Sequence, residues 1–393
     1  MAAVGRPDER LRAFHVAGTN GKGSTSAILA SLLRAGDRRV ALYTSPHLVD
    51  FRERFMIDGV AITEDDVTGW IRLRTPLVEA LNATFFEATT AMAFELFAAA
   101  DVDVAVIEVG LGGRLDATNV IVPLVAGVAS IGIDHVEFLG ETHEQIAWEK
   151  AGIFKRGRPA VIGERDPAIR ALLAEFAGTA GATPVTVVAE AYAIGDVRVD
   201  PADGTTFTLD GRPLRTGLAG AHQATNTALA MAMLDAAGPA YALPPERTAA
   251  ALAAVRLPGR FQRVGRHIFD VAHNPDGAAV LAATIRAVDP PAPVVALLSV
   301  LNDKDWRGVM TALAGVVDHF VLTNAPTAPA SRAWRLDEPY AFAVEHRWNA
   351  TMEPDFARAL ARAGERGGTV LVTGSFHTVG DAMASLQVSP FAA

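Results

Sequence analysis

The sequence predicts an α/β fold with a mostly parallel central sheet, arranged as two successive domains. Short apolar runs that resemble buried strands alternate with longer stretches that have helical periodicity, which is typical of parallel sheets. The first apolar run leads through a glycine-rich turn directly into a helix. A second series of strands and helices follows the segment at 257–260, so we expect domains at residues 1–257 and 258–393.

The composition excludes several classes of function. The 393 residues are 50% hydrophobic and 20% charged, the net charge is −9, and there is no dense block of Lys and Arg, so we expect no nucleic-acid partner. The chain has no cysteine, which excludes disulfides and thiol catalysis. The N-terminus does not resemble a signal peptide and no apolar run has membrane-spanning length, so we expect a cytoplasmic protein with no membrane partner.

The glycine-rich turn at 18–24 lies between a strand predicted at 14–17 and a helix predicted at 26–33. Backbone N–H groups and the helix dipole converge at such a turn and create an anion site. Gly21 and Gly23 allow a polyphosphate to approach the backbone, Lys22 adds a charge, and the hydroxyl of Ser24 or of its neighbour can hold Mg²⁺. The spacing differs from the Walker A pattern because Gly23 separates Lys22 from Ser24. An ordinary glycine turn before a helix is the alternative.

Polar residues end the next three predicted strands, at the sheet edge where doubly wound folds bind ligands. These residues are Ser45, Glu108 and His135, after strands predicted at 40–44, 102–109 and 125–133. A carboxylate at the end of a buried strand is costly unless it is paired or binds a metal, and Mg²⁺ prefers oxygen ligands. Alternatives remain open: Ser45 can be a turn residue, Glu108 can pair with Arg114, and His135 can be structural.

Other segments have simpler explanations. Thr84 and Glu87 have the spacing of a capping box before a helix predicted at 88–100, and the Phe pair between them is typical of a core. Lys150 ends a helix predicted at 141–150 and by itself resembles a surface lysine. Asn226, on a helix predicted at 218–234, can face solvent or a nucleotide. Residues 51–62 resemble a hairpin or lid, and residues 164–215 resemble a peripheral excursion with hairpin signals at Asp203-Gly204 and Asp210-Gly211.

Nearly all of these clusters resemble signatures of the folylpolyglutamate synthase family of the Mur ligase superfamily, most closely its bacterial dihydrofolate synthase/folylpolyglutamate synthase branch. The matching strings, in chain order, are residues 15–24, 44–47, 84–87, 107–119, 133–140, 148–154, 257–262, 269–275 and 373–379. The resemblance implies an N-terminal P-loop ATPase domain of Mur-ligase type, a C-terminal Rossmann-like α/β domain, and an active site in the cleft between them.

The resemblance also implies a role for each matching residue. ATP would contact Asn20, Gly21, Lys22, Gly23 and Ser24 and, across the cleft, Asn226, Arg260, Asp270 and His273. Two Mg²⁺ ions would be held by Ser45, Glu108, His135 and a carbamylated Lys150, whose amine has become a carboxylate. The pterin side of the substrate pocket would be formed by Thr84, Phe85, Phe86, Glu87, Leu115, Asp116 and Ala117. The catalytic residues would be Lys22, Lys150 and His135.

A ligase of this family adds L-glutamate to dihydropteroate, a reduced folate or both, and family members are typically monomers. The substrate carboxylate attacks the γ-phosphate of ATP to give an acyl phosphate, from which the amine of glutamate displaces phosphate. Cations stabilise the transferring group, and an unmodified, positive Lys150 would repel metal. The alternatives are a Mur ligase acting on a UDP-linked peptidoglycan precursor, and a module that hydrolyses ATP without ligation.

The chain departs from the family pattern at its start. Family members usually carry a longer segment before the phosphate loop, a helix that helps to shape the pteroate pocket, whereas seventeen residues precede Gly18 here. We expect this difference to affect the pterin side of the site and not the ATP side.

Overall fold

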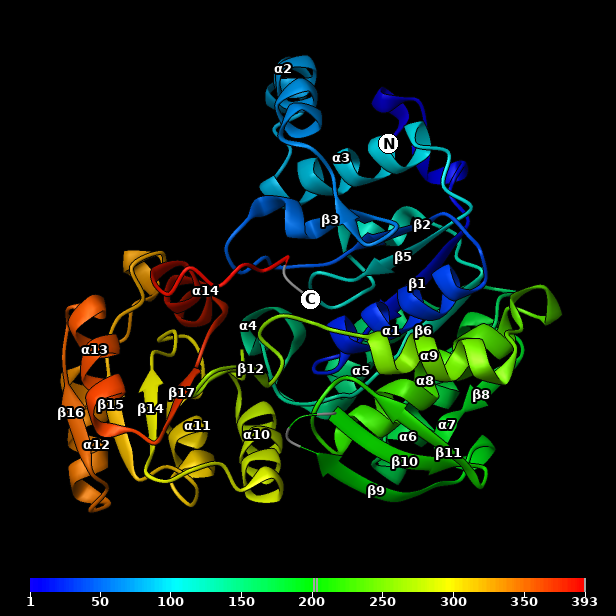
Figure 1. Cartoon of the computed structure of the whole chain (residues 1–393). Coiled ribbons are helices and arrows are strands. Elements are labelled where there is room, and N and C mark those ends of the chain that lie inside the picture. The colour runs from blue at the N-terminus through cyan, green and yellow to red at the C-terminus, as the bar shows by residue number, and fades with distance from the viewer. Residues whose placement is uncertain (201, 203, 392–393) are drawn as a thin grey trace.

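The computed structural model describes residues 1–200, 202 and 204–391. The described residues form an eight-stranded, a three-stranded and a six-stranded sheet (Figure 1). The six-stranded sheet is formed entirely by strands that begin at Gln262 or later. This is consistent with domains at 1–257 and 258–393, although the exact boundary remains a prediction. No helix in the described ranges combines the length and the apolar character needed to cross a membrane.

The eight-stranded sheet has the order β4-β3-β2-β5-β1-β6-β7-β8 and is parallel from β2 to β8. Its strands are β1 (Ala13–Ala17), β2 (Val40–Tyr43), β3 (Phe55–Ile57), β4 (Val60–Ala61), β5 (Val104–Glu108), β6 (Val125–Val128), β7 (Ala160–Ile162) and β8 (Val185–Val187). The antiparallel pair of β3 and β4 confirms the hairpin expected at 51–62.

Helices cover both faces of this sheet. They are α1 (Lys22–Ala35), α2 (Glu64–Ala80), α3 (Phe85–Ala99), α4 (Val136–Leu139), α5 (His143–Ala151), α6 (Pro167–Ala180), α7 (Val188–Ala191), α8 (His222–Ala236) and α9 (Pro245–Ala254). Phe14 and Val16 of β1 pack in the core under α1 and α8, whereas Ala13 and Ala17 face the cores on the opposite side. The central strands β1, β5 and β6 are buried on both faces, which is why they consist mostly of apolar residues.

The six-stranded sheet is mixed, with the order β12-β13-β17-β14-β15-β16, because β12 pairs antiparallel with β13. Its strands are β12 (Gln262–Val264), β13 (His267–Phe269), β14 (Val294–Leu298), β15 (His319–Leu322), β16 (Ala350–Met352) and β17 (Thr369–Thr373). Its helices are α10 (Pro275–Val288), α11 (Trp306–Leu313), α12 (Asp337–Glu345), α13 (Phe356–Arg366) and α14 (Phe376–Ser385). Alternate residues of β14 pack into the cores on its two faces.

The three-stranded antiparallel sheet comprises β9 (Ile194–Asp200), β10 (Gly204–Leu209) and β11 (Arg212–Thr216). The hairpin expected at Asp210-Gly211 is confirmed, and both residues have positive φ, 50° and 76°, as such a turn requires. Asp203, in the other hairpin signal, lies outside the described residues. The excursion at 164–215 is not wholly peripheral, because β8 adds to the edge of the main sheet.

Histidine burial predicts a pH dependence of stability. His15, on β1, is 0% exposed, its Nε2 is 2.9 Å from Thr118 Oγ1, and burial lowers its pKa to about 3. Below about pH 6.5 the imidazole of His15 is protonated in the unfolded chain but stays neutral in the folded chain. The free energy of unfolding therefore falls as the pH drops. From pH 7 to pH 5 the loss from this group is about 2 kcal/mol.

The measurement is urea unfolding at both pH values for the wild type and for His15→Asn. The drop in unfolding free energy between pH 7 and pH 5 should be about 2 kcal/mol smaller in the variant, whatever its stability at pH 7. An equal drop in both proteins would show that His15 does not carry the effect.

Candidate active site

One large cavity, of about 1300 Å³, collects all the residues proposed from the sequence. Its walls include the turn after β1, the ends of β5 and β6, the end of α5, and loops of the six-stranded sheet. It is lined by Asn20, Gly21, Lys22, Gly23, Ser24, Ser45, Thr84, Phe85, Phe86, Glu87, Glu108, Leu115, Asp116, Ala117, His135, Lys150, Asn226, Arg260, Asp270 and His273. Their common location supports a shared site but does not assign their individual roles.

The turn at 18–24 has the geometry of a phosphate loop. It follows β1 and leads into α1 one turn earlier than the sequence predicts, at Lys22. Gly21 has φ of 87°, and a Cβ there would lie 2.6 Å from Asn226 Oδ1, so the position requires glycine. Lys22 Nζ donates to the carbonyls of Gly18 (2.9 Å) and Thr19 (3.1 Å). Burial lowers the pKa of Lys22, while the charges of Glu108 and Asp134 act in the opposite direction.

Glu108 is a buried carboxylate beside this loop. It is 4% exposed, and its Oε2 accepts a hydrogen bond from the backbone N–H of Ser45 at 3.2 Å. Burial raises the pKa of Glu108, with Lys22 and Arg260 opposing that effect. The alternative pairing of Glu108 with Arg114 is wrong, because Arg114 pairs with Glu149 at 2.8 Å.

Lys150 is not a surface residue, contrary to the simplest expectation from its sequence. It lies in the last turn of α5, is 4% exposed, and donates from Nζ to the Gly18 carbonyl at 3.0 Å. That same carbonyl accepts from Lys22. Burial, with a contribution from the positive charge of Lys22, lowers the pKa of Lys150 to about 7. The lowered pKa increases the fraction of the neutral amine, which is the form that reacts with CO₂.

Ser45, Glu108 and His135 offer few oxygen donors for a divalent cation in this structure. No group of three or more His, Cys, Asp or Glu that could hold a metal ion occurs among the residues that the structure describes. The unmodified set offers the Ser45 hydroxyl, the Glu108 carboxylate and the His135 imidazole. A carbamate on Lys150 would add the second anionic oxygen donor that Mg²⁺ favours and would remove a buried positive charge.

The far wall of the cavity comes from the second half of the chain. Arg260 follows α9, and its guanidinium lies 5.1 Å from the ring centre of Phe376. Asp270 accepts hydrogen bonds from the backbone N–H groups of Phe261 and Ala272, both at 2.9 Å. Burial raises the pKa of Asp270, with the charge of Arg260 opposing it. Asn226, on α8, is 8% exposed and lies beside Gly21, so the expectation that it lies across the cleft from the phosphate loop is wrong.

Three of the residues expected on the pterin side, Thr84, Glu87 and Asp116, form hydrogen bonds that stabilise the local backbone. Thr84 and Glu87 form the predicted capping box of α3, with Glu87 Oε2 accepting from the Thr84 N–H at 2.8 Å. Asp116 accepts from the N–H groups of Leu111 and Thr118 and so shapes its own loop. Their side chains are thus partly explained without a ligand.

The cavity mouth carries exposed apolar groups. Phe85, Leu115 and Phe138 line the cavity and remain 64%, 79% and 70% exposed. Phe138, on α4, is not among the residues proposed from the sequence.

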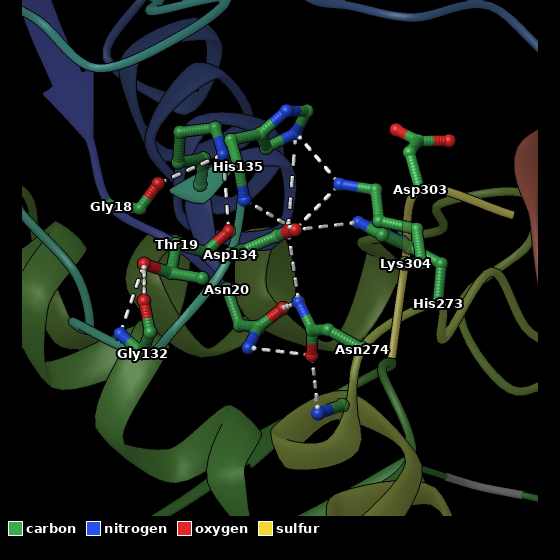
Figure 2. Close-up of polar contacts among 12 residues, drawn as sticks. Gly18, Thr19, Asn20, Gly132, Asp134, His135, His273, Asn274, Asp303 and Lys304 are labelled. Carbon is green, nitrogen blue, oxygen red and sulfur yellow. Dashed lines mark hydrogen bonds and ion pairs between the residues drawn. The ribbon is translucent and has the colours of Figure 1, made fainter. Parts of the chain in front are cut away.

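Three polar residues of the site were also not proposed from the sequence: Asp134, Asn274 and Lys304. They form a polar cluster with His135 and His273 (Figure 2). The chain contains only four lysines, and this scarcity is the sequence feature that could have marked Lys304 as a candidate site residue.

Comparison with known proteins gives a consistent result. The Mur ligase middle domain matches residues 16–234, and the Mur ligase glutamate ligase domain matches residues 259–376. The chain is 37% identical over 379 residues to the dihydrofolate synthase/folylpolyglutamate synthase of Escherichia coli, covering 94% of this chain and 85% of that protein. The Bacillus subtilis protein of the same name is 33% identical over 401 residues, covering 97% and 92% of the two chains.

Solved structures with the same fold carry relevant ligands. Mycobacterium tuberculosis folylpolyglutamate synthase, complexed with ADP and AMPPCP, has a TM-score of 0.91, 34% identity, and coverage of 99% of this chain and 94% of that one. Escherichia coli FolC in complex with DHPP and ADP has a TM-score of 0.84, 34% identity, and coverage of 98% and 91%. A bifunctional folylpolyglutamate synthase/dihydrofolate synthase with Mn, AMPPNP and L-glutamate bound has a TM-score of 0.81, 35% identity, and coverage of 98% and 93%.

Proposed function

Since this chain belongs to the Mur ligase family and, within it, to the dihydrofolate synthase/folylpolyglutamate synthase enzymes, we propose that it joins L-glutamate to dihydropteroate, a reduced folate or both through an acyl phosphate. The chain is accordingly an ATP-dependent acid–amino-acid ligase. The folate relatives match most of its length, which favours this acceptor over a UDP-linked peptidoglycan precursor and favours ligation over simple ATP hydrolysis.

One observation carries the proposal. The phosphate loop, a buried carboxylate, a buried lysine of lowered pKa and the cross-cleft pair of Arg260 and Asp270 all line one cavity. A ligase that forms an acyl phosphate must hold ATP and two organic substrates together and exclude water from the activated intermediate. A cavity of about 1300 Å³ between the two sheets is large enough for the three molecules.

Different groups of the chain bind the phosphates, orient the reactants and hold the metal. The N–H groups of the turn at 18–24 and the ammonium of Lys22 bind the phosphates and stabilise the charge that develops on the transferred phosphoryl group. Arg260, Asp270 and His273 approach the nucleotide from the far side, so that closure of the cleft orients the reactants. Mg²⁺ held by Ser45, Glu108, His135 and carbamylated Lys150 would supply further positive charge when bound. We propose two such ions.

A monomer is sufficient for this site, because the residues proposed for it all line a cavity within one chain. Light scattering during gel filtration is expected to give a mass close to 41.3 kDa. A stable dimer would contradict that part of the proposal.

A coupled assay tests the function. ADP release should require both L-glutamate and a pteroate-type acceptor, with dihydropteroate and tetrahydrofolate run in parallel to identify the preferred acceptor. ADP release that proceeds without glutamate would instead indicate hydrolysis without ligation.

We expect Phe138, at the apolar mouth of the cavity, to contact the pterin ring. Phe138→Ala removes a 70% exposed ring that offers a flat surface to an aromatic substrate. We expect the KM for the pteroate acceptor to rise about 10-fold, as loss of one stacking contact costs about 1 kcal/mol or more. The KM for ATP should stay within about twofold. Leu73→Ala, at an exposed residue of α2 outside the cavity, is the matched control. An unchanged KM for the acceptor would contradict the assignment.

A further inference from the structure

Asp134, in the loop after β6, has contacts with three residues from the second half of the chain (Figure 2). Its Oδ1 accepts from Lys304 Nζ at 2.5 Å. Its Oδ2 lies 3.2 Å from Asn274 Nδ2 and 3.4 Å from His273 Nε2. Residues from two separate loops of the six-stranded sheet thus converge on one carboxylate of the eight-stranded sheet. We call these four residues the Asp134 cluster.

The Asp134 cluster also reaches the phosphate loop. Asn274 Nδ2 donates to Asn20 Oδ1 at 3.3 Å, and Asn20 Nδ2 lies 3.4 Å from Asn274 Oδ1. Asn274 Oδ1 in turn accepts from the N–H of Gly277 at 2.8 Å and caps α10. The N-terminus of α10 is therefore fixed both to Asp134 and to the loop expected to bind the phosphates.

The lysine in this cluster is unusual for this chain. Lys and Arg together number 35, yet only four are lysine: Lys22, Lys150, Lys155 and Lys304. Three of these four line the large cavity. The side chains of Lys304 and Asp134 are only 7% and 8% exposed, and Lys304 Nζ also lies 3.0 Å from His135 Nε2. In the more exposed ion pairs, such as that of Arg332 with Asp303, the cation is an arginine and not a lysine.

We propose that Asp134 and Lys304 are positioning residues that lock the two halves of the chain in the closed arrangement and thereby align the cross-cleft groups with the phosphate loop. They act through Asn274 and Asn20 and, because Lys304 Nζ lies 3.0 Å from His135 Nε2, also by holding the His135 imidazole. The inference depends on the proposed ligase function only for its activity readout.

The physical argument rests on desolvation. A buried ion pair gains little net stability, because removing both charges from water offsets their attraction, but removing one partner is strongly destabilising because it leaves a buried charge uncompensated. When the halves separate, Asp134 and Lys304 each return to water and the penalty disappears. The pair therefore favours a defined closed geometry without making closure irreversible, which suits an enzyme that must open to release product.

Closure can be measured directly, because the chain has no cysteine that would compete with introduced labels. We would place spin labels at Ala171→Cys on α6 and Ala357→Cys on α13, two exposed helical positions outside the cavity. With AMPPNP, Mg²⁺ and L-glutamate present, the otherwise wild-type protein should give one narrow distribution of label distances. Asp134→Asn and Lys304→Met should each broaden that distribution toward longer distances.

Activity supplies a second readout that a purely structural role would not produce. In each single variant kcat should fall about 100-fold, the size of effect that a misalignment of about 1 Å produces, while the affinity for AMPPNP stays within about twofold. The double variant should lose about as much as either single variant, because its two changes break the same contact. Losses that multiply to about 10⁴-fold would show two independent roles and overturn the proposal.

Asp303→Asn is the matched control. Asp303 is adjacent to Lys304, but its carboxylate pairs with Arg332 on the same side of the cleft, at 2.6 Å (Figure 2 shows Asp303 and Lys304). This variant should keep the wild-type distance distribution and turnover. Wild-type distances in both Asp134→Asn and Lys304→Met would overturn the inference even if their activity were low. Normal closure of a wild-type protein that lacks ligase activity would overturn the proposed function and not the positioning role.

Discussion

Lys150→Ala is expected to abolish amide formation, with turnover at least about 10³-fold below wild type, while AMPPNP still binds. Lys150 is buried against the Gly18 carbonyl, and its pKa is lowered to about 7, so carbamylation can convert a costly buried cation into an anionic metal ligand. The variant lacks that ligand and should lose most of the charge stabilisation that a correctly placed metal supplies. Turnover with saturating ATP, acceptor and L-glutamate measures the loss.

Two controls make this result specific to the carbamate. Lys155→Ala removes a lysine five residues later, which bonds Asn119 Oδ1 at 2.8 Å and does not line the large cavity, so its turnover should stay within about threefold of wild type. Acetate or formate, which can place a carboxylate in the space left by the lost side chain, should partly restore Lys150→Ala. Wild-type turnover in Lys150→Ala would show that no carbamate is needed.

Lys22→Ala is expected to lower kcat by about 10³-fold, the second large effect. Lys22 is the cation of the phosphate loop, and its ammonium is held by the carbonyls of Gly18 and Thr19. Removing one fixed positive charge from the transferring phosphoryl group lowers the rate about 10²- to 10³-fold, and loss of loop order adds to this. Single-turnover measurement of ADP formation isolates the phosphoryl-transfer step.

Lys22→Arg separates charge from fit. A guanidinium is broader than an ammonium and cannot take the same place between two carbonyls, so this variant should remain at least about 10-fold below wild type. Turnover of Lys22→Ala within about fivefold of wild type would mean that the phosphates are bound elsewhere.

Local patterns in the sequence predict most of the N-terminal half and its site. Residues with strong local signals, such as the capping box at Thr84 and Glu87 and the glycine turn after β1, lie where expected. The polar residues that end parallel strands could be grouped in advance, because such strand ends share one edge of a sheet. The structure places Ser45, Glu108 and His135 around one cavity. The strand predicted at 125–133 is too long, however, because β6 ends at Val128 and His135 lies directly before α4.

What the sequence could not supply depends on contacts between distant segments. Lys150 resembles a surface lysine because its own helix says nothing about the Gly18 carbonyl, which is 132 residues away. The pairing of Arg114 with Glu149 instead of Glu108 depends on how α5 packs against the loop after β5. Lys304 meets Asp134 only because the two sheets come together. β12 and β16, of three residues each, are too short to show a pattern.

The most direct test of the central claim is a crystal structure of this protein with AMPPNP and Mn²⁺, with the anomalous signal of manganese used to locate the ions. The account predicts the triphosphate in the turn at 18–24 and manganese beside Glu108, His135 and a carbamylated Lys150. A turn without phosphate, or manganese density far from Glu108 and His135, would contradict it.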